Sequence, residues 1–202
     1  SQGMDVELFW ILEDIGAAEA LVVKPAIKTA KDLKGKRIGT PFVSTSHYQL
    51  MYALQKWGYK PGEVQVLNMR PADIGAAWQR GDIDGTFIWD PVLAQTKKDG
   101  HVLITSAQVG EMGRPTFDGM LVSRKFAKAN PDFMVNLVKI LAKNDAEYKA
   151  NKAAWTVKSM QVQAVAKISG AKAEDVPEGM ALYVFPSLEE QASNKWLGGG
   201  KN

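Results

Sequence analysis

The sequence predicts an α/β protein, because strand and helix patterns alternate through its first half. Between Arg37 and Ile104, four short apolar runs of strand length are separated by three segments with helical spacing. Such alternation is typical of a sheet with substantial parallel pairing. After residue 123 the pattern becomes helical, so we expect an α/β part followed by a helical C-terminal third.

The first expected strand is Val6 to Leu12, and Ala20 to Val23 is the second. We expect Glu13, Asp14 and Gly16 to form an acidic turn between them. A buried strand so close to residue 1 has no earlier partner, which favours a chain that is incomplete at its N-terminus.

The alternating part follows from Arg37 onward. Each helix has apolar residues at helical spacing, or Pro at its first position, and ends near Gly or Lys. The expected strands are 37–40, 64–67, 85–89 and 102–104, and the expected helices are 46–57, 72–80 and 92–98.

A strand at Asp118 to Val122 precedes the helical part. Asn130 is expected to cap a helix that reaches Lys149, and a further helix covers 156–169. Ser187 and Glu190 form a capping box that opens a last helix.

Composition excludes several kinds of protein. With 46% apolar residues in 202, the chain is globular rather than disordered, and no apolar run approaches a membrane span. The net charge is only +3, with basic residues scattered among acids, so no nucleic-acid partner is expected. The absence of Cys, with only two His, excludes disulfides, thiol catalysis and the usual zinc sites. No cofactor and no metal are expected.

The segment from Thr40 to Tyr48 is the most informative one for function. A strand ends there, three hydroxyl residues follow (Ser44, Thr45 and Ser46), and a helix begins. Free N–H groups at a helix N-terminus bind anions, and hydroxyls add neutral donors. Ordinary helix capping by one hydroxyl is the alternative interpretation.

Carboxylates at strand ends are the second signal. Glu13, Asp90 and Asp118 each lie at the expected end of a strand, where open α/β sheets bind ligands. They could hold an ammonium group, with Trp89 or Phe42 packed beside it. Solvated turns and helix caps are the alternatives for Asp90 and for Asp14.

Evidence for catalysis is slight. Ser44 and His47 could form a nucleophile–base pair, but no G-x-S-x-G sequence surrounds the serine. A neutral His47 that lines a pocket is the better interpretation. We therefore expect a protein that is not an enzyme.

Five stretches together carry a resemblance to a known family. They are residues 16–24, 32–38, 41–48, 76–85 and 115–118. In these stretches the chain resembles the taurine-binding proteins of ABC importers, within the aliphatic sulfonate/nitrate/taurine solute-binding family.

The resemblance implies a type II periplasmic-binding-protein fold, with two lobes that close over a ligand at a hinge. It implies residues 1–24 as part of lobe 1, 25–112 as lobe 2, and 113–202 as the helical remainder of lobe 1. Members of the family are longer, so the first lobe is expected to be partial and the chain incomplete at both ends.

The resemblance also implies site residues. The implied sulfonate-contacting residues are Ser44 and Thr45, and the implied pocket-lining residues are Phe42 and His47. Asp118 matches the position that holds the ammonium, and Trp89 matches one along the carbon chain. The match to ligand-binding positions is weaker at Glu13 and Asp90. The expected partners are a small-molecule ligand and the permease subunits of an ABC importer. The expected location is periplasmic, or lipid-anchored outside the cytoplasmic membrane.

Two alternatives to taurine binding stay open at this stage. One is the same fold binding another alkanesulfonate, nitrate or a small anion. The other is an enzyme resembling the thiamin-pyrimidine synthases, which use pyridoxal phosphate and whose active sites are rich in Cys and His. The chain lacks that composition.

Overall fold

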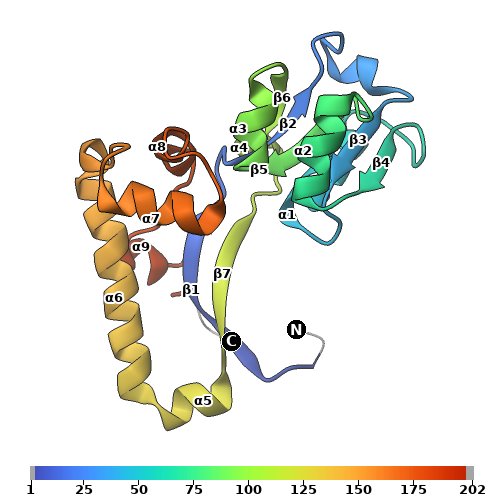
Figure 1. The fold of residues 1–202 in the computed structure, drawn as a ribbon. Helices are drawn as coiled ribbons and strands as arrows, with labels where there is room; N and C mark the ends of the chain where they lie inside the picture. Colours follow the sequence, from blue (N-terminus) through green and yellow to red (C-terminus); the bar gives the residue numbers. More distant parts are fainter. Residues whose placement is uncertain (1–2, 199–202) are drawn as a thin grey trace.

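The computed structural model describes residues 3–198 as two regions joined by two crossing segments (Figure 1). The strands are β1 (Val6–Asp14), β2 (Glu19–Val23), β3 (Arg37–Thr40), β4 (Gln65–Asn68), β5 (Gly85–Trp89), β6 (His101–Thr105) and β7 (Phe117–Ser123). The α-helices are α1 (Thr45–Lys56), α2 (Pro71–Arg80), α3 (Val92–Lys97), α4 (Ser106–Glu111), α5 (Arg124–Ala129), α6 (Pro131–Ala150), α7 (Met160–Ser169), α8 (Val176–Ala181) and α9 (Leu188–Gln191). Two 3₁₀ turns, η1 (Ala30–Leu33) and η2 (Lys152–Ala154), complete the described elements.

The first region is a five-stranded sheet covered by helices on both faces. Its strand order is β4-β3-β5-β2-β6. Strand β3 pairs in parallel with β4 and β5, whereas β2 is antiparallel to both of its neighbours. The expected α/β alternation is therefore confirmed, in a mixed sheet rather than a purely parallel one.

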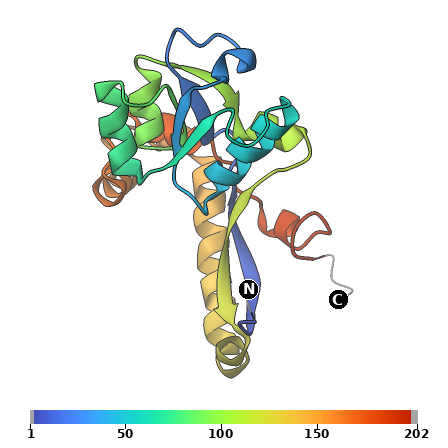
Figure 2. The ribbon, with the colours of Figure 1, turned by 90° about the vertical axis from the view of Figure 1, so that its right-hand side faces the viewer.

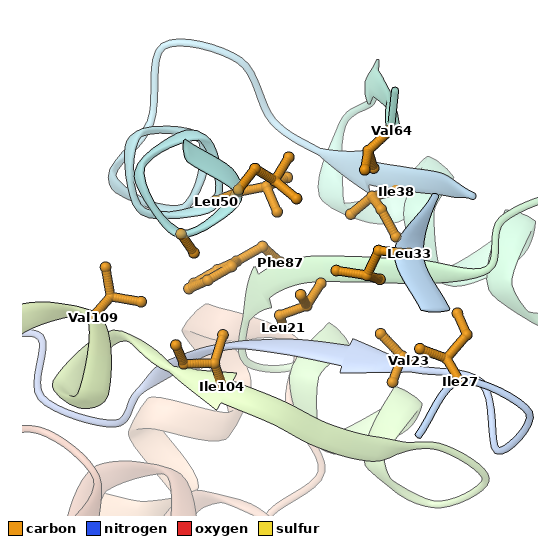
Figure 3. Packing of buried hydrophobic residues seen from close by; sticks show 12 residues of the cluster. Leu21, Val23, Ile27, Leu33, Ile38, Leu50, Val64, Phe87, Ile104 and Val109 are labelled. Carbon is orange, nitrogen blue, oxygen red and sulfur yellow. The ribbon is translucent and has the colours of Figure 1, made fainter. Parts of the chain in front are cut away.

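Strand β2, which lies between β5 and β6, shows how the sequence builds two cores. All five of its residues are buried. Since side chains alternate across a strand, Leu21 and Val23 face one core while Ala20 and Val22 face the other. Helices α1 and α4 close the first core, which is centred on Phe87 (Figure 3), and α2 and α3 close the second.

The position of β2 bears on the expected division into lobes. We expected residues 1–24 to belong to the first lobe, but β2 lies inside the five-stranded sheet. A run of five buried residues suits a strand with neighbours on both sides and helices on both faces.

The second region is a two-stranded antiparallel ribbon of β1 and β7, flanked by the C-terminal helices. The 20-residue α6 runs alongside the ribbon, and both extend away from the sheet region (Figure 2). Gln191 of α9 closes one edge of β1, because its amide accepts from the Ile11 N–H at 2.8 Å and donates to the Ile11 carbonyl at 3.0 Å. Trp10 and Ile11 are buried there.

Several element boundaries differ from expectation. Glu13 and Asp14 do not form a turn: they belong to β1, because they pair with Asp118 and Phe117 of β7. Helices α4, α5 and α8, each six residues long, were not expected at all. The helix expected from residue 156 begins at Met160, where the Ser159 hydroxyl caps it. Across residues 3–198, no helix has the combination of length and apolar character that crossing a membrane requires.

Candidate functional site

The candidate site is a cavity of about 920 Å³ between the two regions. Side chains from the sheet region and from the β1–β7 region both line it. The lining residues are Ile15, Glu19, Val43, Ser44, Thr45, His47, Tyr48, Met51, Trp89, Thr116, Asp118 and Tyr183.

One wall of the cavity is the N-terminus of α1. The Ser44 hydroxyl caps this helix by accepting from the His47 backbone N–H at 3.1 Å, and it donates to the Pro41 carbonyl at 2.6 Å. Capping by one hydroxyl, the alternative interpretation of this segment, is thus present at Ser44, while the remaining N–H groups of the first turn have no partner within the helix. The wall offers an anion neutral donors and the positive end of a helix dipole.

The loop before α1 is strained at the cavity. Val43 has φ +58°, the left-handed region that a β-branched residue rarely adopts, and its side chain is fully exposed. Such strain persists where the surroundings hold it, and it is common at ligand-binding loops.

His47 and Phe42 stack on each other beside this wall. Their ring centroids are 4.2 Å apart and the rings are 10° from parallel. Burial lowers the pKa of His47, so the imidazole is neutral at neutral pH and presents a hydrogen-bond donor without charge. Phe42 does not line the cavity itself and reaches it only through His47.

Glu19 is an acidic lining residue that the sequence reasoning did not single out. It is the first residue of β2, it is only 5% exposed, and its Oε1 accepts from the Thr45 hydroxyl at 2.6 Å. Burial raises the pKa of Glu19 to about 7, although hydroxyls of Thr45, Ser46 and Ser106 stabilise the anion in part. Its other oxygen, Oε2, is buried without a hydrogen-bond partner.

The opposite wall carries Asp118 near the start of β7. Asp118 is exposed toward the cavity, and it pairs across the ribbon with Glu13. Burial, then the charge of Asp118, raises the pKa of Glu13 to about 7. The nearby Tyr183 hydroxyl also has a raised pKa, because of burial and of four surrounding carboxylates that include Glu13, Glu19 and Asp118.

Asp90 lies outside this cavity. Its Oδ1 accepts from the Ala94 N–H at 2.8 Å, and the side chain faces a smaller hollow between α3 and α8. Glu13 is likewise absent from the cavity lining, although it pairs with Asp118 across the ribbon. Of the eight residues predicted to bind ligand, the cavity therefore brings together Ser44, Thr45, His47, Trp89 and Asp118.

The charged side chains in the described lining of the cavity are all acidic. Its described lining contains two carboxylates and neither Lys nor Arg. Within residues 3–198 there is also no group of three His, Asp or Glu side chains placed to hold a metal ion. The site can thus offer neutral donors at the α1 N-terminus, with Glu19 beside them and Asp118 on the opposite wall.

A family model described as "NMT1/THI5 like" matches residues 16–152. The chain belongs to this family. It is 43% identical over 177 residues to the taurine-binding periplasmic protein of Escherichia coli (strain K12), a match that covers 88% of this chain and 55% of that protein. The chain spans about half the length of this curated relative.

Solved structures agree with the family assignment. The alkanesulfonate-binding protein SsuA from Xanthomonas axonopodis pv. citri, bound to MOPS, superposes with a TM-score of 0.72 at 26% identity, covering 90% of this chain and 61% of that one. The periplasmic aliphatic sulphonate binding protein SsuA from Escherichia coli gives 0.71 at 26%, covering 90% and 60%. The expected resemblance and the type II periplasmic-binding-protein fold are confirmed.

Glu19 and Tyr183 are two of the lining residues that sequence reasoning missed. Tyr183 lies between α8 and α9, with no local pattern to mark it. Glu19 lies within a stretch that carried the family resemblance, and an acid beginning an otherwise apolar strand was the signal that could have identified it.

Proposed function

We propose that this protein is a periplasmic solute-binding protein that captures taurine, or a closely related amino-sulfonate, and delivers it to an ABC importer. The observation that carries the proposal is the pairing of a neutral anion-binding helix N-terminus with carboxylates across one cavity. Taurine has a sulfonate that is always anionic and an amine that is cationic, so each end of the ligand meets the wall that suits it.

In the proposed complex the sulfonate lies at the N-terminus of α1. Backbone N–H groups of the first turn donate to its oxygens. The hydroxyls of Ser44 and Thr45, which donate to the Pro41 carbonyl and to Glu19 in this structure, turn to the sulfonate, and His47 lines the same end. Trp89 packs along the two-carbon chain. Asp118 accepts from the ammonium, and a charge-assisted bond of this kind contributes about 1.5–3 kcal/mol.

The charge of the cavity favours taurine over the other ligands of this fold. Nitrate or an unsubstituted alkanesulfonate would satisfy the helix wall but would leave the carboxylates without a counter-ion, which is unfavourable in a partly buried site. The binding role, rather than catalysis, is supported by the relatives described above, which are binding proteins.

The two regions are proposed to act as the lobes that close on the ligand, with residues 25–112 forming most of the second lobe. The crossing segments lie side by side, because the Ile15 N–H donates to the Thr116 carbonyl at 3.1 Å. Both residues line the cavity, so bending of these segments would open and close it.

Calorimetric titration with taurine, ethanesulfonate and nitrate tests the proposal. We expect taurine to bind most tightly, with ethanesulfonate weaker by about tenfold or more because it lacks the ammonium. We expect Asp118→Asn to weaken taurine more than ethanesulfonate. Tightest binding of nitrate would contradict the taurine assignment, and equal losses for both sulfonates would contradict the role of Asp118.

A further inference from the structure

The proposed roles of the α1 N-terminus and of Asp118 leave the environment of Glu19 unexplained. It is a carboxyl group that is almost fully buried yet lines the ligand cavity, and one of its oxygens is unpartnered. A buried carboxylate without a counter-ion is costly. A purely structural side chain at this position could be apolar or an amide at lower cost.

The groups that face Glu19 come from four parts of the fold. Thr45 and Ser46 of α1 and Ser106 of α4 present hydroxyls, whereas Asp118 of β7 adds a like charge. Tyr183, from the segment after α8, has both acids among its neighbours. His47 lines the same cavity but is neutral. None of these groups supplies a positive charge.

An ammonium group supplies what this environment lacks. It has three N–H donors and one positive charge, whereas the cavity has two carboxylates and, among the described residues that line it, neither Lys nor Arg. Glu19 is also next to the anion wall, since its Oε1 is 2.6 Å from the Thr45 hydroxyl. An amine placed against Glu19 must therefore belong to a ligand whose cation and anion are separated by only a short chain.

We propose that Glu19 is a second carboxylate of the ammonium subsite, neutral in the empty cavity, which ionises when a short amino-sulfonate enters. This inference rests on the proposed function and deepens it. The proton leaves the Glu19 carboxyl for solvent, and the carboxylate that remains accepts from the ligand ammonium together with Asp118. Sulfonates without an amine bring no positive charge to balance the Glu19 carboxylate, so Glu19 selects against them.

Proton linkage gives this proposal a distinctive signature. Because burial raises the pKa of Glu19 to about 7, the group is mostly protonated at pH 6 and mostly ionised at pH 8. Taurine binding should release about one proton at pH 6 and almost none at pH 8. Ethanesulfonate should release none at either pH.

The experiment is calorimetric titration at pH 6 and pH 8 in two buffers of different ionisation enthalpy, with taurine and ethanesulfonate as ligands. The variant Glu19→Gln keeps an acceptor for Thr45 and should bind taurine about tenfold or more weakly at pH 8, with ethanesulfonate unchanged or tighter. It should also release no proton with taurine at pH 6. Asp90→Asn is the matched control, a half-buried strand-end acid outside the cavity, and should behave as wild type.

The outcomes separate this inference from the proposed function. Tight taurine binding without proton release at pH 6, or equal losses for both ligands in Glu19→Gln, overturns the role of Glu19 and leaves the taurine receptor standing. Proton uptake with both ligands would also overturn it, because it would place Glu19 beside the sulfonate as a neutral donor. Absence of taurine binding by the wild-type protein overturns both.

Discussion

The sheet region and the ribbon region of this molecule are stabilised in different ways. The five-stranded sheet has a core on each face, built entirely from residues between 20 and 109. The ribbon of β1 and β7 buries few large apolar side chains with its helices, chiefly Trp10, Ile11, Tyr148 and Val162, while Leu121 is 61% exposed and Ile168 is 88% exposed. The comparison teaches that one half of the cleft has a core of its own, whereas the other half is held together by strand pairing and a few buried side chains.

The largest expected difference between the regions is in their response to loss of one isoleucine. Ile38 of β3 is fully buried, so Ile38→Ala should lower the free energy of unfolding by about 2–5 kcal/mol through lost burial and a cavity. Ile168 of α7 is 88% exposed, so Ile168→Ala should change it by less than about 0.5 kcal/mol. Urea denaturation followed by circular dichroism measures both, and equal losses would contradict the comparison.

The next effect concerns the link between α9 and β1. Gln191→Leu removes both hydrogen bonds to the buried Ile11 backbone, which leaves an N–H and a carbonyl unpaired at a cost of about 2 kcal/mol. Amide hydrogen exchange of Ile11 should accelerate while that of β5 stays slow. Gln163→Leu, at an exposed glutamine of α7, is the control and should leave both rates unchanged.

A smaller effect is the dependence of stability on pH. The pKa of Glu19 and of Glu13 is raised from 4.5 to about 7, so between these values the folded state binds more protons than the unfolded state. Stability is therefore greatest below pH 4.5 as far as these groups are concerned, and it falls as pH rises through 7. Thermal unfolding of wild type and Glu19→Gln from pH 5 to pH 8 measures this, and parallel curves would refute it.

The smallest effect concerns the ion pairs that bridge the two regions. Lys97 of α3 lies 3.1 Å from Glu178 of α8, and Lys98 lies 3.9 Å from Asp175. Both pairs are partly exposed, so Lys97→Gln should cost less than about 1 kcal/mol, and less still at high salt. A larger loss by thermal unfolding would mean that the regions depend on each other more than their separate cores suggest.

The sequence was most informative where local patterns determine structure. The alternation from Arg37 to Ile104, the helix cap at Ser44 and the capping box at Ser187 all have strong local signals, and the structure contains each of them. The antiparallel placement of β2 between β5 and β6 was not predictable, because an apolar run of five residues shows burial but not direction.

The candidate site was predictable on one wall only. A strand, three hydroxyls and a helix indicate an anion site by themselves, whereas the two acids of the cavity come from parts of the chain far apart in sequence. Glu19 meets Thr45 across 26 positions, and Asp118 reaches the cavity through the pairing of β7 with β1. Burial, which decides the protonation of Glu19, is a property of the fold and not of the residues around it in sequence.

The most direct test of the account is a crystal structure of this protein with taurine bound. We predict sulfonate oxygens within hydrogen-bond distance of the first-turn N–H groups of α1 and of Thr45, and the ligand nitrogen between Glu19 and Asp118. A sulfonate bound away from the α1 N-terminus, or a nitrogen that contacts neither carboxylate, would contradict the assignment of the cavity.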